Sequence, residues 1–164
     1  MRNPLPPDEL SRLLAETLPS LRELTAELGP DEWLYRPDPN EWSITEIICH
    51  LRDVDREIHL PRLHSLMIEK EAFMPGVISD VWAIERDYQA QDGQAALATL
   101  AASRAELIDL LPPAGSTIWQ RHGRHTFFGP TSFLELVCLA LEHDILHLTQ
   151  ATETVESSTR AKKE

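Results

Sequence analysis

Apolar residues recur at three- and four-residue spacing in four long stretches of this chain, which is the pattern of amphipathic helices. The stretches cover about residues 8–28, 43–70, 93–111 and 132–155. Capping boxes begin the second and the fourth stretch, formed by Ser43 with Glu46 and by Ser132 with Glu135. No repeat and no strand-like alternation competes with these helices. The sequence therefore predicts an all-α fold, a four-helix bundle.

Prolines and long connections predict where this bundle is irregular. Pro19 and Pro61 lie inside the first and second helices, so each is expected to kink or interrupt its helix. Residues 30–42 read as a linker that carries three aromatic side chains. Residues 71–92 are long enough to cross the bundle, with a short helix expected near 81–85, and the loop 112–130 is long enough to be functional or to hide a short element.

Length and charge bound the class of protein. With 164 residues the chain fits one domain, 1–164, with an ordered core of about 8–155 and a polar tail that is expected to fray. Its 27 acidic and 15 basic residues give a formal charge of −12, which argues against nucleic acid and anionic membranes as partners. Cys49 and Cys138 have no CxxC spacing, which favours a reducing compartment. The first residues lack the apolar region of a signal peptide, so we expect a cytoplasmic protein.

Two histidines lie four residues apart in the last predicted helix, His143 and His147. That spacing places both imidazoles on one helix face, with Cβ atoms about 5–6 Å apart, so both can bind one metal ion. His50, near the start of the second helix, is the best candidate for a third ligand. Three neutral imidazoles with an open position are typical of a catalytic transition-metal site.

The depths of these histidines in their helices predict how the helices run. His50 lies about 10 Å beyond the cap at Ser43, and His147 lies about 12 Å before Val155. The depths agree when the second and fourth helices are antiparallel, which a long crossover between the second and third helices permits. Under this arrangement the aromatic residues of the 30–42 linker would line the mouth of the site: Trp33, Tyr35 and Trp42.

The other histidines fit the site less well. His59 is nine residues after His50 and so on the opposite helix face, where we expect it to be solvated. His64 shares the face of His50 but lies about 21 Å farther along. His122 and His125 belong to a loop at the far end of the bundle and would join the site only if that loop folded back. Any single histidine of the proposed set could instead be a hydrogen-bonded core residue.

The residues that orient the imidazoles stay open at this point. Asp144 could cap a helix, orient a ligand or face solvent. Cys49 and Cys138 are expected to be small core residues and not nucleophiles. The candidates to hydrogen-bond an outer imidazole nitrogen are Glu46, Asp53, Glu142 and Gln150.

The motifs around these histidines resemble those of the DinB-like superfamily, also called the DinB/YfiT metalloenzymes, over about residues 8–155. The matching segments are Glu41 to Leu51, Arg62-Leu63, His125 to Gly129 and His143 to Gln150. The resemblance implies a four-helix bundle with a long crossover and a site for divalent zinc or nickel, with His50, His143 and His147 as ligands. It also implies a small-molecule substrate and a low-molecular-weight thiol such as bacillithiol, mycothiol or glutathione.

Three functions are consistent with these patterns. The first is a metal-dependent thiol S-transferase or related hydrolase, in which the ion activates a thiol or a water molecule as the nucleophile. The second is a non-catalytic metal-binding or stress-response bundle, for which a homodimer is one expected assembly. The third treats His143 to His147 as a variant of the HExxH metalloprotease motif. It is the least favoured, because Asp144 is one methylene shorter than the glutamate that serves there as general base.

Overall fold

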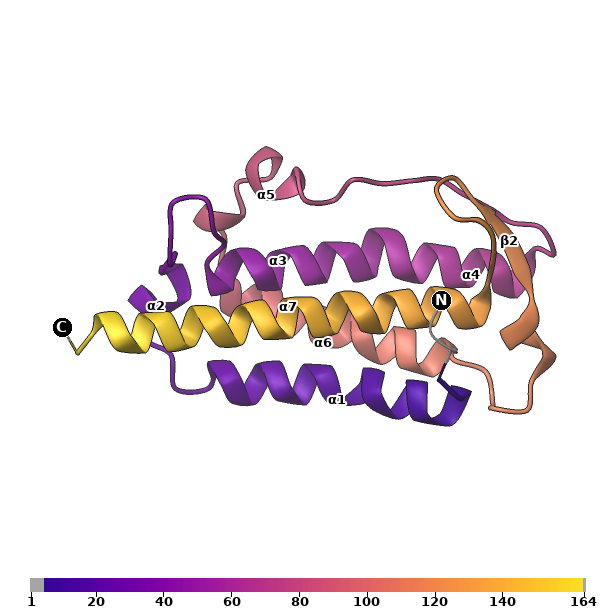
Figure 1. Ribbon diagram of the computed structural model, residues 1–164, viewed down its shortest axis with the longest axis horizontal. Coiled ribbons are helices and arrows are strands. Elements are labelled where there is room, and N and C mark those ends of the chain that lie inside the picture. The colour runs from indigo at the N-terminus through magenta and orange to yellow at the C-terminus, as the bar shows by residue number, and fades with distance from the viewer. Residues whose placement is uncertain (1–4, 164) are drawn as a thin grey trace.

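The computed structural model describes residues 5–163, so the expectations about the first four residues and the last one lie outside it. Four long helical segments pack into a bundle, as predicted (Figure 1). They are α1 (Pro7–Thr25), α3 with its extension α4 (Ile44–Val54 and Leu60–Ile68), α6 (Gly93–Leu110) and α7 (Phe133–Ala161). In Figure 1, α3, α4 and α6 run from left to right, and α1 and α7 run from right to left. None of the helices in this part of the chain could span a lipid bilayer.

The first helix contains a proline without being broken by it. Pro7 stands at the first helical position, where its missing N–H would be unpaired in any case. Leu10, Leu14 and Leu21 face the core, at the spacing that the sequence predicted. The helix continues through Pro19 to Thr25, so of the two predicted outcomes, a kink or a break, the break does not occur.

The second helical segment changes its winding just before Pro61. It begins with the predicted capping box, in which the Ser43 hydroxyl accepts from the Glu46 N–H and the Glu46 carboxylate accepts from the Ser43 N–H. Residues Asp55–His59 then form a π-helix, η1, in which the Leu60 N–H donates to the Asp55 carbonyl five residues earlier. Because Pro61 has no N–H to donate to the preceding turn, the irregularity predicted at this proline takes the form of a wider turn.

A small three-stranded sheet lies at one end of the bundle, and the prediction that no strands compete with the helices was wrong. β1 (Phe73–Met74) pairs in parallel with β2 (His122–His125), which pairs antiparallel with β3 (Gly129–Ser132). At Gly123 a Cβ atom would stand 2.6 Å from the backbone oxygen of Ala72, so only glycine lets β1 approach this closely. Strands of two and four residues are too short to show an alternating pattern in the sequence.

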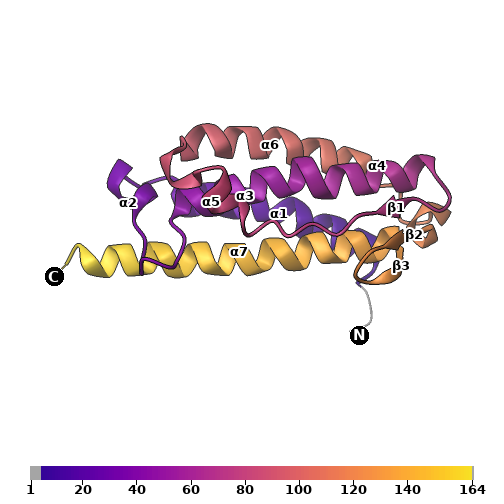
Figure 2. The same ribbon diagram turned by 90° about the horizontal axis from the view of Figure 1, so that it is seen from above.

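The connections between the long helices hold short elements. They are α2 (Pro30–Leu34), α5 (Trp82–Glu85), η2 (Tyr88–Ala90) and η3 (Thr117–Gln120). The short helix expected near residues 81–85 is confirmed by α5, whereas α2 lies in a segment that was expected to be a plain linker. Figure 2 shows the crossover from β1 to α5 running along the bundle on the side where α3, α4 and α7 lie.

The last helix is longer than predicted. It continues to Ala161, whereas the sequence predicted a fraying tail from about Val155. Thr154 and Ser158 are buried there, at 3% exposure each. The segment around α2 supplies partners, because the Tyr35 hydroxyl lies 3.2 Å from the Ser157 hydroxyl and Lys162 lies 2.8 Å from the Glu32 carboxylate. A polar sequence therefore stays helical here because another segment covers it.

The apolar core is divided into two clusters along the bundle. The cluster toward the sheet includes Leu14, Leu107 and Leu141, and the cluster toward α2 includes Leu21 and Leu100. Each long helical segment places one polar residue between the two clusters. These four buried residues are Thr17, Asp55, Arg104 and Asp144. We call them the polar layer, and the histidines described next lie beside it.

Candidate metal centre

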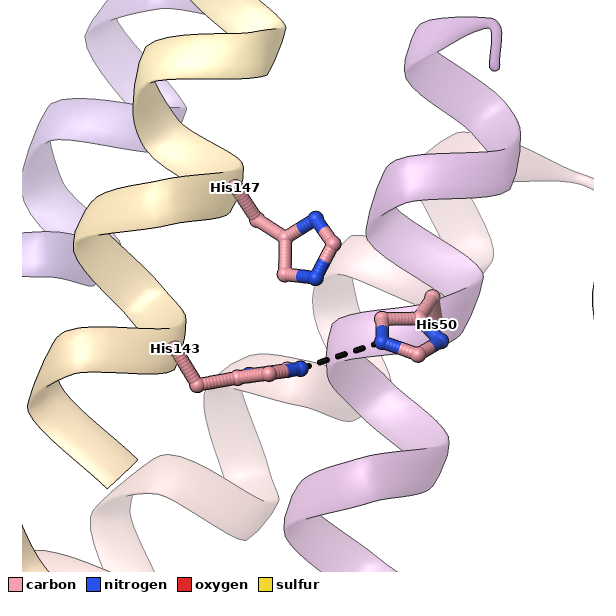
Figure 3. Close-up of side chains that lie close together, drawn as sticks. All are labelled: His50, His143 and His147. Atoms are coloured by element: carbon pink, nitrogen blue, oxygen red, sulfur yellow. Dashed lines mark hydrogen bonds between the residues drawn. The ribbon is translucent and has the colours of Figure 1, made fainter. Parts of the chain in front are cut away.

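Three histidines from two helices converge beside the polar layer (Figure 3). His50 comes from α3, and His143 and His147 come from successive turns of α7. One ring nitrogen of each lies within 4.8 Å of the others, and the Nε2 atoms of His50 and His143 are 3.0 Å apart. Among residues 5–163 this is the one group of three such side chains close enough to share an ion. The structure therefore brings together the three residues that the sequence singled out.

The three imidazoles are shielded from solvent, which keeps them neutral. His50 is completely buried, and His147 is 7% exposed. Burial, together with the neighbouring imidazoles, lowers the pKa of His50 to about 3 and that of His143 to about 4. Burial also lowers the pKa of His147. Neutral imidazole is the form that binds a metal, so no proton has to be displaced at neutral pH.

The outer nitrogens of the three rings differ in their partners. The Nδ1 atom of His147 lies 2.8 Å from the amide oxygen of Gln150, so Nδ1 carries the hydrogen and Nε2 keeps its lone pair for the cluster. The Nδ1 atoms of His50 and His143 are buried and have no hydrogen-bond partner in the described part of the chain. Nε2 atoms bound to one tetrahedral zinc ion at about 2.0–2.1 Å would be about 3.3 Å apart. The spacing and the all-imidazole donor set therefore fit a divalent transition metal.

Of the four residues expected to orient the imidazoles, only Gln150 does so. Glu46 is held by Arg36 and by the N–H of Ser43. Asp53 accepts hydrogen bonds from Arg52, Arg86 and Tyr88. Glu142 is exposed to solvent.

One of the three linker aromatics covers the site. The ring of Trp42 stacks on His147, with centroids 5.8 Å apart and planes 8° from parallel, and lies 4.9 Å from the ring of His50. Trp33 instead packs in the apolar cluster toward α2, and Tyr35 bonds to Ser157. Of the three aromatic residues expected to line the site, Trp42 is the one that does so.

His59 is the site neighbour that sequence reasoning placed wrongly. Its ring lies beside that of His143, with centroids 5.6 Å apart and planes 76° from parallel, and its Nε2 atom is buried without a partner among the described residues. Burial, then the charge that His143 would carry, holds the pKa of His59 well below its usual value. The prediction of a solvated side chain assumed a regular helix, whereas the extra residue in the π turn rotates His59 by about 100°. Pro61 was the signal for that irregularity.

Asp144 belongs to the polar layer and does not face the histidine cluster as a free base. Arg104 donates to both carboxylates of the layer: its Nε lies 2.9 Å from Asp55 Oδ2, its Nη2 lies 3.0 Å from Asp144 Oδ1, and its Nη1 donates to Asp144 Oδ2. The Thr17 hydroxyl donates to Asp144 Oδ2 at 2.9 Å. Burial raises the pKa of Asp55 to about 6, against the lowering by Arg104. The metalloprotease-like hypothesis, which needs Asp144 as general base, loses its support.

Sequence reasoning missed Arg104 and Asp55 altogether. The signal was present, because Arg104 interrupts the apolar stripe of the third helix between Leu100 and Leu107. An arginine at a core-facing position is almost always paired with carboxylates.

The two cysteines and the remaining histidines stay outside the cluster. Burial raises the pKa of Cys49 to about 11 and also raises that of Cys138, so neither supplies a thiolate at neutral pH. His64 is exposed beside Glu106. The Nδ1 atom of His125 accepts from the backbone N–H groups of Phe127 and Phe128 in the sheet. His122 is exposed on the same strand, β2.

Comparisons with known proteins agree with this geometry. A family model described as the DinB superfamily matches residues 13–151. The fold is similar to YfiT from Bacillus subtilis, described as a probable metal-dependent hydrolase with an unusual four-helix bundle topology. The TM-score is 0.79 and the identity 17%, over 90% of this chain and 85% of that one, which shows the fold. A sequence comparison with curated proteins finds no match.

Proposed function

Since the chain belongs to the DinB superfamily, we propose that it is a divalent-metal-dependent enzyme, either a hydrolase or an S-transferase that uses a low-molecular-weight thiol. The cation would be zinc or nickel, held by the Nε2 atoms of His50, His143 and His147. The observation that carries the proposal is the convergence of three neutral imidazoles, two buried and that of His143 partly buried, with no carboxylate or thiolate among them. The description of YfiT as a probable metal-dependent hydrolase supports it.

A cation in this position would supply Lewis acidity, lowering the pKa of a thiol or a water molecule placed against it. Residues of the chain itself orient the ligands and shield the site. Gln150 holds His147 in the tautomer that offers Nε2. Trp42 covers two of the rings and limits the entry of water, which strengthens electrostatic interactions beneath it.

The nucleophile has to come from outside the chain. Cys49 and Cys138 are held as neutral thiols by burial. A small thiol such as bacillithiol, mycothiol or glutathione, or a water molecule, would take that role. Arg104 is already engaged by Asp55 and Asp144, so it is not free to bind the carboxylates of such a thiol.

A second function is favoured by one observation, the depth of the site. His50 is completely buried, and two surface cavities along α4, of about 230 and 90 Å³, are not lined by any of the three histidines. A cation enclosed in this way could serve only to stabilise a metal-binding bundle.

The test is metal content and turnover measured on one set of proteins. The wild type, His50→Gln, His147→Gln and the exposed-site control His64→Gln would be prepared with zinc or nickel. We expect about one ion per chain in the wild type and the control, and loss of the ion in the other two. Ester and amide substrates would be tested with water alone, and electrophiles with each of the three thiols.

The results of this experiment distinguish the two functions. Metal-dependent turnover that His50→Gln abolishes and His64→Gln retains supports an enzyme. The reaction in which turnover occurs, with water alone or with one of the thiols, identifies the nucleophile. A large fall in melting temperature on chelation, without turnover in any arm, favours the stabilising role. Equal metal content in all four proteins would contradict both.

A further inference from the structure

We propose that His59 is a positioning residue of this site, whose Nε2 atom accepts a hydrogen bond from the Nδ1–H of His143 when His143 binds the cation through Nε2. The inference rests on the metal binding proposed above. It concerns a side chain of the π turn that neither the sequence pattern nor the family motif includes.

The chemistry of the ligand demands such an acceptor. An imidazole that binds a metal through Nε2 carries a hydrogen on Nδ1, and that N–H almost always donates to a carboxylate, a carbonyl or water. His147 meets this need through Gln150. His143 has the same need, but its Nδ1 atom is buried without a partner among residues 5–163.

His59 carries the matching unpaired atom on the adjacent ring. Its Nε2 atom is also buried without a partner in the described part of the chain, and a neutral imidazole has one acceptor nitrogen. The centroids of the two rings are 5.6 Å apart at an interplanar angle of 76°. An N–H···N bond of about 2.9 Å plus two ring radii needs a centroid distance of about 5.3 Å, which is close to the observed separation of the two rings.

The carboxylate of Asp144 does not compete well for this hydrogen. Asp144 follows His143 in the sequence, but its two oxygens already accept from Arg104 and Thr17. Moving Asp144 toward His143 would break the polar layer that joins four helical segments.

The winding of the helix provides an independent reason. On a regular α-helix a residue nine positions after His50 lies about 180° away from it. The π turn Asp55–His59 adds one residue and rotates His59 back toward α7. Single π turns within α-helices frequently mark functional sites, and this one ends at His59.

The experiment compares His59→Leu and His59→Gln with the wild type and with His64→Leu, an exposed histidine on α4. Zinc affinity would be measured by competition with a chelator, and the melting temperature would be measured on metal-free protein. We expect His59→Leu to bind zinc about 10- to 100-fold more weakly. Its metal-free melting temperature should be unchanged or higher, because a buried atom without a partner has been removed. Gln offers an acceptor oxygen, so His59→Gln should regain most of the affinity, and His64→Leu should match the wild type.

A spectroscopic signature separates this bond from ordinary packing. In zinc-loaded wild type the Nδ1 proton of His143 should be protected from exchange and visible by proton NMR, and in His59→Leu it should be lost. Wild-type affinity in His59→Leu would overturn the inference, and so would an affinity loss that follows a lowered metal-free melting temperature and that Gln does not restore. Failure of the metal binding on which this inference rests would look different, since the wild type itself would then bind no zinc.

Discussion

The Nδ1 atom of His147 lies 2.8 Å from the side-chain oxygen of Gln150, almost one turn further along α7. Because an amide oxygen can only accept, this contact fixes the hydrogen on Nδ1 and leaves the lone pair on Nε2, which faces His50 and His143. One of the three imidazoles is therefore prepared for a metal in the absence of any ion. In the sequence, this arrangement is visible as two polar residues three positions apart, His147 and Gln150.

Replacing Gln150 with Leu should weaken metal binding without preventing it. The three imidazoles remain, but His147 loses the acceptor that fixes its tautomer and ring orientation. We expect zinc affinity to fall about 10-fold or more, measured by chelator competition. Gln150→Glu keeps an acceptor and should bind at least as tightly as the wild type.

The control for this prediction is Gln94→Leu on the exposed face of α6, which should leave zinc affinity unchanged. If Gln150→Leu bound zinc as the wild type does, the contact would be incidental to the site.

Arg104→Met should destabilise the protein strongly. The substitution leaves two buried carboxylates, Asp55 and Asp144, without their shared cation. Removing one partner from a buried ion pair costs about 3–5 kcal/mol, so the free energy of unfolding should fall by about that amount in urea titrations.

Arg12 provides the comparison, because its ion pair with Glu16 joins side chains that are 58% and 57% exposed. Arg12→Met should change stability by less than about 1 kcal/mol. Equal effects of the two arginine substitutions would mean that the polar layer is hydrated or carries little energy.

Local signals in the sequence were sufficient for the long helices and for the histidine cluster. Two capping boxes located the starts of α3 and α7, and the structure confirms both. The four-residue spacing of His143 and His147 defines one helix face, and His50 was paired with it by depth. The depth estimate took Val155 as the end of the helix, whereas α7 continues to Ala161.

The features that were missed depend on contacts between distant segments. Ser158 is polar and looks like part of a fraying tail, but it is buried, and the neighbouring Ser157 and Lys162 contact the segment around α2. Likewise, β1 consists of two residues whose pairing partner lies about fifty positions away. The position of His59 depends on a change of winding that periodicity rules do not represent. Tertiary packing, and not local propensity, decides all three.

Ser158→Glu tests the covered end of α7. Ser158 is 3% exposed, so a glutamate there would place an unpaired charge in a buried position. We expect the free energy of unfolding to fall by about 2 kcal/mol or more. Thr159 is the exposed neighbour, and Thr159→Glu should have little effect. Similar small effects at both positions would show that the last turns of α7 are frayed in solution, as the sequence alone suggested.

The metal-free protein should lose stability as the pH falls from about 6.5 toward 4. Burial holds the pKa of His50 near 3 and that of His143 near 4 in the folded state, whereas histidines of the unfolded chain titrate near about 6.5. The unfolded state therefore binds more protons across this interval, and each such histidine removes about 1.4 kcal/mol of stability per pH unit of acidification. His59 and His147, whose pKa values burial also lowers, act in the same direction. Asp55 acts in the opposite direction, because its folded pKa is raised to about 6 and the folded state binds its proton first.

Unfolding by urea in the presence of a chelator, at several pH values between about 7.5 and 4.5, measures this slope directly. The histidines outnumber the single opposing carboxylate, so the net effect should be destabilisation by acid. His143→Gln removes one titrating group and should make the slope shallower by up to about 1.4 kcal/mol per pH unit. His64→Gln, at an exposed position, should leave the slope as it is in the wild type. A slope that is the same in His143→Gln as in the wild type would mean that His143 titrates normally in the folded protein, and the cluster would then be open to water.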